Sequence, residues 1–332
     1  MQHGFLNILL SQQAIDLYGA QIEAAVNQAT VHAQHPRASS GRTDGVRLAT
    51  PKLLWHTLES QANVDGTHPI DICFISRDIT GASTKTNVLP TLARCYEILR
   101  ASPQLQWVHA HSAGADRPIY AELRARGVRV STSAGANAAP VAHTAVGAVL
   151  ALGRQFPLQM AAQRRREYTP MTNHPDLHDL TGQTAMVVGL GAIGSRIARY
   201  LDVLGLKVIG VTREPADHIN LDATRAEGGE LGHCQTICSY AHMRRHLAEV
   251  NYLVLACPLT PLTKALVNAE LLSQLPKGSY LVNVARGEVC VEVDVIAALQ
   301  NGHLGGAFLD GFEHEPLSPE SPLWAMRNVM IS

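Results

Sequence analysis

One turn restricts what this chain can fold into more than any other feature of the sequence. The segment TAMVVGLGAIGSRIARYLDVLGLKVIGVTR carries three glycines in the spacing G-x-G-x-x-G. An apolar run precedes the first glycine, and apolar residues at helical spacing follow the third. In a strand–turn–helix unit the first glycine permits a tight turn, the second lets the backbone approach a pyrophosphate, and the third lets helix and strand pack closely. The spacing therefore predicts a dinucleotide-binding βαβ unit, with Gly189, Gly191, Ala192, Ile193 and Gly194 as the contacting residues.

The end of the next apolar run bears on which dinucleotide is bound. Sites that prefer NAD usually place a carboxylate there for the ribose hydroxyls, about 20 residues after the glycines. This chain has Thr212 followed by Arg213, so neither of these two positions places a carboxylate that would repel a 2′-phosphate. The guanidinium of Arg213 is suited to pair with that phosphate, although a solvated surface arginine is the alternative. We expect NADP(H) to be favoured over NAD(H).

Two series of alternating elements indicate two domains, as expected for 332 residues at roughly 100–200 residues per domain. Buried strands are predicted at 5–11, 70–76, 105–111 and 128–133, and then at TAMVVG, LKVIGV, YLVLAC, SYLVNV and GAFLD. Helical segments lie between them, including 53–60 and 121–127, and such alternation is typical of parallel βαβ units. A helix over 138–156, followed by a basic excursion over 164–182, separates the two series. We predict one domain at residues 1–136 and a second at 137–332.

Composition excludes several classes of protein. Hydrophobic residues make up 46% of the chain and charged residues 17%, and the formal net charge is −1. This balance is typical of a globular protein and does not favour a nucleic-acid or anionic-membrane partner. The longest apolar stretch, 145–152, is far shorter than the ~20 residues of a membrane span. With no convincing signal peptide and six scattered cysteines, we expect reduced thiols and a cytoplasmic protein.

One spacing resembles a metal site. Cys234, Cys238, His242 and His246 fall four residues apart and would line up on one continuous helix. The residues between the two cysteines and the helical HMRRHLAEV fit the end of a strand or a turn, which breaks that alignment. We therefore expect no metal site.

Five segments together resemble one known family. They are WVHAHSAGADRPIYAELRARGVRVSTSAGANAAPVAHTAVGAVLALGR, the glycine turn, LACPLTPLTKALVN, LPKGSYLVNVARGEV and GAFLDGFEHEPL. From residue 106 onward the chain resembles the D-isomer-specific 2-hydroxyacid dehydrogenases, which include glyoxylate/hydroxypyruvate reductases. The resemblance implies an α/β fold with two domains, a Rossmann-type doubly wound nucleotide domain and a flavodoxin-like substrate domain, with the active site in the cleft.

The resemblance also implies roles for individual residues. Arg286 would hold the substrate carboxylate and polarise the keto oxygen, since a planar guanidinium can contact both groups. Glu315 would orient a histidine and raise its pKa, so that the imidazole donates a proton as hydride arrives. Backbone amides at Ala113 and Gly114 would bind the carboxylate, and Asp310 would lie near the nicotinamide carboxamide. The remaining expected cofactor contacts are Cys257, Pro258, Thr263, Val284 and Ala285.

The general acid of the family is not among these residues. In the family, the strand matching NVMIS is followed within about two residues by a Pro-His pair and then by a segment that returns to the first domain. The printed sequence stops at Ser332, and none of its sixteen histidines matches that position. Either the natural protein continues and supplies both, or it ends here without them. We expect it to continue.

The function implied is an NAD(P)-dependent oxidoreductase. It would transfer hydride between a nicotinamide and a small 2-oxo or D-2-hydroxy acid such as glyoxylate or hydroxypyruvate, and it would form a homodimer as family members usually do. A formate or phosphite dehydrogenase is an alternative within the same class. A dinucleotide-sensing interaction protein of the same fold, without turnover, is the alternative from another class.

Overall fold

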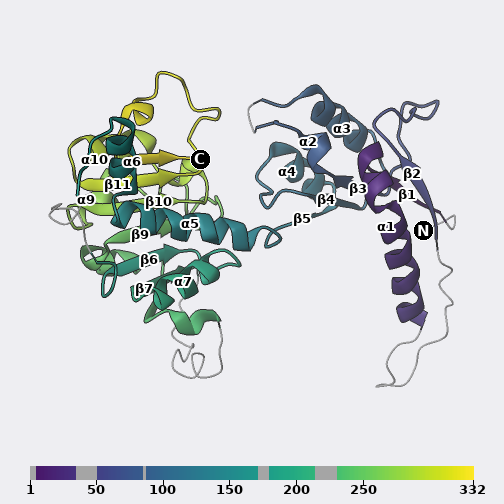
Figure 1. Ribbon diagram of the computed structural model, residues 1–332. Coiled ribbons are helices and arrows are strands. Elements are labelled where there is room, and N and C mark those ends of the chain that lie inside the picture. The colour runs from purple at the N-terminus through teal and green to yellow at the C-terminus, as the bar shows by residue number, and fades with distance from the viewer. Residues whose placement is uncertain (1–4, 35–50, 85–86, 171–178, 214–229) are drawn as a thin grey trace, which may run out of the picture. The chain divides into compact units, whose positions relative to one another are not determined.

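The computed structural model describes residues 5–34, 51–84, 87–170, 179–213 and 230–332. These residues form two compact units, Met1–Ala134 and Gly135–Ser332 (Figure 1). Each unit is built on a sheet in which every described strand pair is parallel. The predicted α/β class is therefore confirmed, whereas the substrate and nucleotide roles expected of the two units stay predictions.

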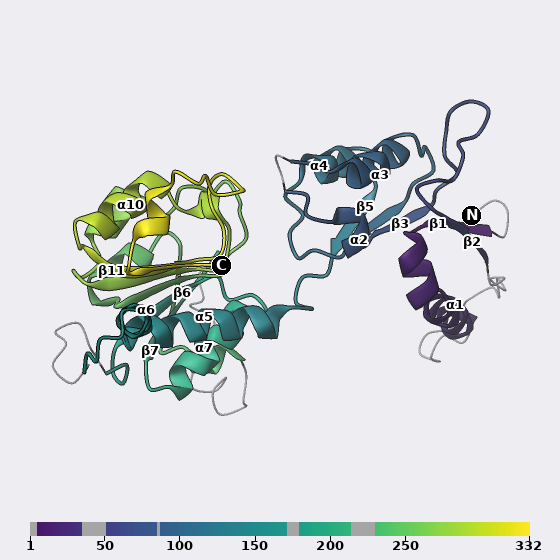
Figure 2. The same ribbon diagram turned by 45° about the horizontal axis from the view of Figure 1, so that its top comes forward.

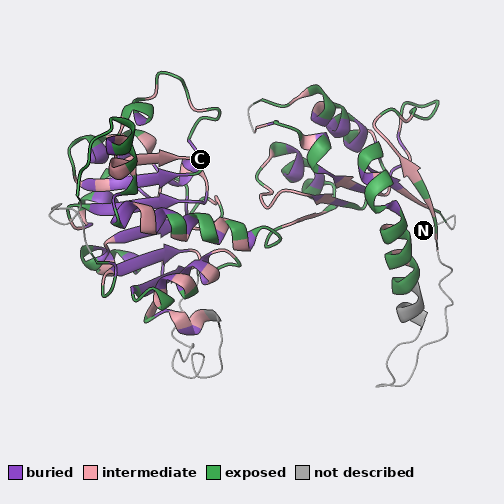
Figure 3. Cartoon of the chain, in the orientation of Figure 1, coloured by how far each residue is buried: buried purple, intermediate pink, exposed green. Residues whose placement is uncertain are grey.

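The first unit has the strand order β2-β1-β3-β4-β5, which is the order of flavodoxin-like sheets. The predicted flavodoxin-like architecture is thus confirmed. Helices α3 and α4 pack their apolar faces on one side of the sheet, against Val108 and Ala110 among others. On the other side α1 covers the β1–β2 end, while its outer surface is exposed (Figure 3). The elements are β1 (Phe5–Leu9), α1 (Gln12–Gln34), β2 (Lys52–His56), β3 (Ile72–Ile75), α2 (Arg77–Thr80), α3 (Pro90–Arg100), β4 (Trp107–Ala110), α4 (Pro118–Ala125) and β5 (Arg129–Thr132).

The helix predicted over 53–60 is wrong, because the segment begins within strand β2. Leu53 and Trp55 are half-buried and alternate with the more exposed Leu54, which is the period of a strand. They pack against Ile8 of β1 and Ala14 of α1. A run this short fits either periodicity, so the pairing with β1, far away in sequence, decides the outcome.

The second unit has the strand order β12-β11-β10-β9-β6-β7-β8, so the direction of winding reverses between β6 and β9. This is the doubly wound order of Rossmann-type folds, with one further strand at the β12 edge. The strands are β6 (Thr184–Val188), β7 (Lys207–Thr212), β8 (Thr236–Ser239), β9 (Tyr252–Leu255), β10 (Ser279–Asn283), β11 (Leu304–Leu309) and β12 (Val329–Ile331). The helices are α5 (Ala138–Gly153), α6 (Phe156–Arg164), α7 (Gly194–Val203), α9 (Ala269–Ser273) and α10 (Glu292–Gln300), with short 3-10 turns η2 (Glu230–His233), η3 (Met243–Glu249), η4 (Gly287–Val289) and η5 (Pro322–Ala325).

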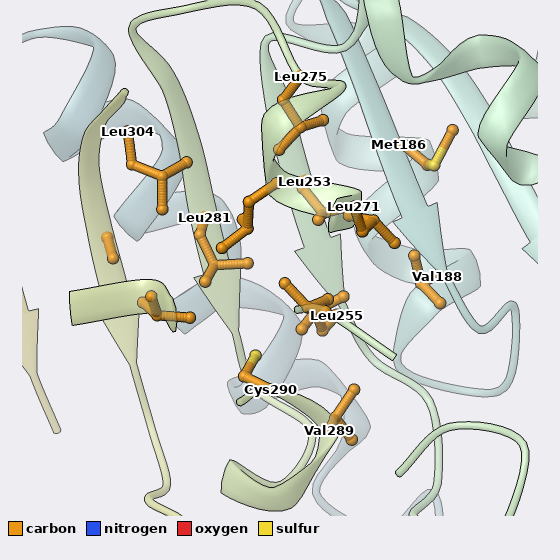
Figure 4. Close-up of a cluster of buried hydrophobic side chains, with 14 of the residues drawn as sticks. Met186, Val188, Leu253, Leu255, Leu271, Leu275, Leu281, Val289, Cys290 and Leu304 are labelled. Atoms are coloured by element: carbon orange, nitrogen blue, oxygen red, sulfur yellow. The ribbon is translucent and has the colours of Figure 1, made fainter. Parts of the chain in front are cut away.

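Both faces of this sheet are covered, which explains why its central strands are apolar at every position. All residues of β6, β9 and β10 are buried. Figure 2 shows α10 on one face and α5 with α7 on the other. On the α10 side, Leu253, Leu255 and Leu281 from adjacent strands pack with Leu271 and Leu275 (Figure 4).

The long helix predicted over 138–156 is broken into two. Helix α5 ends at Gly153, and α6 begins at Phe156. Between them Gln155 adopts a left-handed conformation with φ of 55°, and its side chain donates to the Tyr280 hydroxyl at 2.8 Å. Gly153 lets the helix end approach the sheet, since a Cβ there would lie 2.5 Å from the Tyr252 hydroxyl. Of the predicted excursion over 164–182, residues 171–178 lie outside the described part of the chain.

None of the described helices combines the length and the apolar character that crossing a bilayer requires.

Candidate functional site

The parallel strands of the second unit end at one edge of the sheet, and most of the predicted site residues lie there. Gly189 follows β6, Thr212 ends β7, and Cys257 lies two residues beyond β9. Arg286 follows β10, and Asp310 follows β11 directly. Open α/β sheets bind ligands outside the carboxyl ends of their strands, where the strand order reverses. Here that reversal lies between Gly189 and Cys257.

The three glycines of the turn meet three different steric conditions. Gly189 has a φ of +95°, and a Cβ on it would lie 2.7 Å from the Cys257 Cα. A Cβ on Gly194 would lie 1.8 Å from the Gly189 carbonyl oxygen, so helix α7 can pack on the turn only without a side chain. A Cβ on Gly191 would meet no atom of the described residues within 4 Å. Gly191 thus leaves space beside the backbone at the start of α7, where helix amides favour a phosphate.

Alanine substitutions of the last two glycines are expected to separate binding from folding. Gly194→Ala should lower the melting temperature markedly, because overpacking at this contact costs about 1–3 kcal/mol or more. Gly191→Ala should leave the melting temperature nearly unchanged and weaken NADPH binding by at least tenfold, about 1.4 kcal/mol, because the new methyl group occupies the approach to the turn. Thermal melts and NADPH titrations of both variants test this. Unchanged NADPH affinity in Gly191→Ala would contradict the binding role of the turn.

Thr212 and Arg213 lie at the end of β7, and Arg213 is exposed. The Tyr240 amide, just after β8, donates to the Thr212 carbonyl at 3.2 Å. Burial raises the pKa of the Tyr240 phenol, the neighbouring Cys257 adds to the rise, and the positive charge of Arg213 opposes it. The Tyr240 phenol therefore lies close enough to Cys257 and Arg213, two of the predicted cofactor contacts, for them to affect its pKa. No sequence motif had pointed to Tyr240.

Cys257, Pro258 and Thr263 form the loop after β9. Burial raises the pKa of the Cys257 thiol to about 11, so the group is neutral near pH 7 and does not repel a phosphate. The Thr263 hydroxyl donates to the Pro258 carbonyl at 2.7 Å and accepts from the Thr260 amide at 2.8 Å. The Thr263 side chain is buried and stabilises the loop through these two hydrogen bonds. A direct contact from Thr263 to the dinucleotide stays a prediction.

The loop that carries Arg286 is shaped by a buried amide at the end of β10. The Asn283 side chain accepts from the Ala285 amide and donates to the Arg286 carbonyl, each at 3.0 Å. Val284 and Ala285 are buried, whereas Arg286 is half-buried and donates from Nη1 to the Ala285 carbonyl at 2.8 Å. Asn283 was missed by sequence reasoning. The signal available was an asparagine ending an apolar strand, because this residue often hydrogen-bonds the backbone of a turn two residues on.

Asp310 and Glu315 lie on a second loop that packs against the first. A Cβ on Gly287 would lie 1.9 Å from the Phe312 carbonyl carbon, so the two loops touch through backbone. Partial burial raises the pKa of the Asp310 carboxyl, while a hydrogen bond with Ser332 and the charge of Arg286 oppose the rise. Glu315 is exposed, and its Oε1 accepts from the Phe312 amide at 3.3 Å. Arg286, Asp310 and Glu315 are therefore brought onto adjoining loops.

Ala113 and Gly114 belong to the first unit, in the turn after β4. The Ser112 hydroxyl donates to the Gly114 carbonyl at 3.2 Å within this turn. Arg117 donates to the carbonyls of Ser83 and Thr84, both at 2.7 Å, and so ties the turn to a neighbouring loop. Binding of one substrate jointly by this turn and Arg286 stays a prediction.

The four residues with metal-like spacing do not share one helix. Cys238 lies in β8, His242 follows it in a turn, and His246 lies in the 3-10 turn η3. Both Cys234 and Cys238 are buried. Across the described ranges, no three side chains of His, Cys, Asp or Glu are grouped as a metal ion would require.

The doubly wound sheet, the reversal of strand order and the glycine turn define the class of protein, an α/β protein with a dinucleotide-binding domain. Residues 146–332 match the family model described as D-isomer specific 2-hydroxyacid dehydrogenase, NAD binding domain. This match spans more than half of the chain.

Similar proteins carry consistent names. A glyoxylate/hydroxypyruvate reductase of Arabidopsis thaliana is 30% identical over 237 residues, 71% of this chain and 68% of the relative. A glyoxylate reductase of Korarchaeum cryptofilum is 28% identical over 241 residues, with 71% of this chain and 68% of the relative covered. The crystal structure of a D-isomer specific 2-hydroxyacid dehydrogenase from Xanthobacter autotrophicus, in complex with NADPH and MES, is 27% identical with a TM-score of 0.64. The alignment covers 99% of this chain and 87% of that one.

The chain belongs to the D-isomer-specific 2-hydroxyacid dehydrogenase family. It is an oxidoreductase that depends on a nicotinamide dinucleotide.

Proposed function

We propose that the protein reduces a small 2-oxo acid, such as glyoxylate or hydroxypyruvate, to the D-2-hydroxy acid with NADPH. The observation that carries the proposal is the placement of Arg286, whose loop follows β10 at the same sheet edge as the glycine turn. A half-buried guanidinium there matches a carboxylate next to a carbonyl group. The names of the Arabidopsis and Korarchaeum relatives support this class of substrate.

Each residue has a proposed part in the reaction. Arg286 binds the substrate carboxylate and draws electron density from the keto oxygen, and the amides of Ala113 and Gly114 bind the carboxylate from the first unit. A bound nicotinamide cofactor supplies the hydride. Glu315 would hold the imidazole of a general-acid histidine, a position that none of the sixteen histidines of this sequence matches. A carboxylate beside such a ring would favour its protonated form, so that it could give a proton to the new hydroxyl. Asp310 would lie near the carboxamide of the nicotinamide when the cofactor is bound.

The preference for NADP(H) rests on the end of β7. Arg213 is exposed there, and the strand ends without a carboxylate at Thr212 or Arg213. The Xanthobacter relative was crystallised with NADPH, which supports the same reading. We propose that Arg213 binds the 2′-phosphate.

The function is tested by following NADPH oxidation with glyoxylate and hydroxypyruvate. We expect saturable turnover at about 1–10³ s⁻¹, the usual range for enzymes, and a clearly lower kcat/KM with NADH. L-glycerate and D-glycerate, offered with NADP⁺, provide the stereochemical control, since the D-acid alone should be oxidised. Tight NADPH binding without turnover of any small 2-oxo acid would instead favour a dinucleotide-sensing protein.

We also propose a cytoplasmic homodimer that has no nucleic-acid or membrane partner. All six cysteines are buried and free, which fits a reducing compartment, and the net charge of −1 offers little attraction to nucleic acid. Light scattering after gel filtration tests the dimer, because a monomer mass across the micromolar range would contradict it.

A further inference from the structure

The side chain of Asn283 is almost completely enclosed and is shared among groups of one loop. It is 2% exposed. Its carbonyl oxygen accepts from the Ala285 amide at 3.0 Å, and its Nδ2 donates to the Arg286 carbonyl at 3.0 Å. The same Nδ2 lies 3.7 Å from the Cys290 sulfur, within the range of a weak hydrogen bond. A buried amide needs such partners, because an unsatisfied one costs free energy.

These contacts act on the backbone on both sides of Arg286. The amide of Ala285 and the carbonyl of Arg286 are both held by Asn283. The carbonyl of Ala285 in turn accepts from Arg286 Nη1 at 2.8 Å. The Arg286 guanidinium is therefore hydrogen-bonded to the carbonyl of the peptide group between Ala285 and Arg286. The groups on either side of it, the Ala285 amide and the Arg286 carbonyl, are hydrogen-bonded to the Asn283 side chain. If the Asn283 bonds are lost, the Ala285 amide loses this acceptor and the Arg286 carbonyl keeps the bond from the Val289 amide at 3.2 Å, so the peptide group that carries the Nη1 acceptor is held less firmly.

The other side of the loop leaves little room for adjustment. A Cβ on Gly287 would lie 1.9 Å from the Phe312 carbonyl carbon, so the backbone after Arg286 is pressed against the loop that carries Asp310 and Glu315. The Asp310 amide donates to the Asn283 carbonyl at 2.9 Å. Asn283 thus contacts the Arg286 loop through its side chain and the neighbouring strand through its backbone.

We propose that Asn283 is a positioning residue, which directs the Arg286 guanidinium toward the carboxylate and keto oxygen of the substrate. The inference rests on the proposed 2-oxo acid reductase function, and it assigns to Asn283 a contribution made through Arg286. Bidentate recognition depends on orientation, and a displacement of about 1 Å can cost roughly 100-fold in rate.

The decisive test is a double-mutant cycle between Asn283→Asp and Arg286→Lys in the full-length protein. Ionised aspartate keeps the acceptor for the Ala285 amide and lacks the donor to the Arg286 carbonyl. We expect Asn283→Asp alone to lower kcat/KM for glyoxylate by about 10- to 100-fold. In the Arg286→Lys background the same change should cost less than about threefold, because the guanidinium it positions is already absent.

Three further measurements separate positioning from a general loss of structure. The Kd of oxamate, a carboxylate-bearing substrate analogue, should rise by at least about tenfold in the complex with NADPH, whereas the Kd of NADPH alone should stay within about twofold. Asn251→Asp is the matched control, since the Asn251 side chain accepts from the Thr184 amide at the opposite edge of the sheet. It should leave both constants unchanged. If Asn283→Asp does not fold, Asn283→Ser takes its place, because a shorter hydroxyl retains a local acceptor.

Each outcome bears on one proposal. Equal losses from Asn283→Asp in both backgrounds, or loss of NADPH affinity in parallel with oxamate affinity, would overturn the positioning role. Strong coupling between the two substitutions would support it. Absence of turnover with any 2-oxo acid in the wild-type enzyme would contradict the proposed function itself, which the cycle presupposes.

Discussion

Replacing Arg286 with lysine is expected to lower kcat/KM for glyoxylate by about 100- to 1000-fold, the loss typical of removing a donor aimed at a developing oxyanion. Lysine keeps the positive charge but presents a single ammonium group, which cannot contact a carboxylate and a keto oxygen in one plane. The loss should fall on kcat as well as on KM, since polarisation of the keto oxygen matters most in the transition state.

Steady-state kinetics with NADPH held at saturation measure this effect. The NADPH Kd should stay within about twofold, because Arg286 is expected to bind substrate and not the dinucleotide. Arg245→Lys is the matched control, since Arg245 is exposed on η3. Kinetics of Arg286→Lys that equal those of the wild type would remove Arg286 from the mechanism.

Replacing Arg213 with alanine is expected to raise the Kd of NADPH by about 10- to 100-fold, the range for losing hydrogen bonds to a charged group. The Kd of NADH should change by no more than about twofold, because NADH lacks the 2′-phosphate. The difference between the two cofactors should shrink at high salt, since Arg213 is exposed and its charge is screened.

Fluorescence titrations with both cofactors at low and high ionic strength provide the measurement. Arg199→Ala is a suitable control, because Arg199 is an exposed arginine of the same unit on α7. Parallel weakening of NADPH and NADH by Arg213→Ala would show that Arg213 does not discriminate between them, and the proposed preference for NADP(H) would then fail.

The apolar runs of the second unit could be predicted as strands, because a parallel sheet covered on both faces needs apolar residues at every position of its central strands. The strands TAMVVG, YLVLAC and SYLVNV, predicted from such runs, are β6, β9 and β10. Strand β2 and the break between α5 and α6 could not be predicted from the sequence. Strand β2 depends on its pairing with β1. The break depends on the contact of Gly153 with Tyr252 and on the hydrogen bond from Gln155 to Tyr280.

The candidate site likewise has features that the sequence predicted and features that only the structure revealed. Arg286 and Glu315 were found through motifs, yet the motifs do not show that the two loops touch at Gly287 and Phe312. Asn283 shapes the Arg286 loop through hydrogen bonds that become visible only when the loop is folded. Tyr240 likewise lies close to Thr212 because β7 and β8 are paired.

The sequence by itself determined the features that depend on a few neighbouring residues. Glycines at 189, 191 and 194 and the periodicity around them define the turn, because backbone sterics and side-chain period act locally. The tertiary structure decided the strand order, the reversal between β6 and β9, and the meeting of the Arg286 and Glu315 loops. These features depend on contacts between segments far apart in the chain, where packing and burial outweigh local preference.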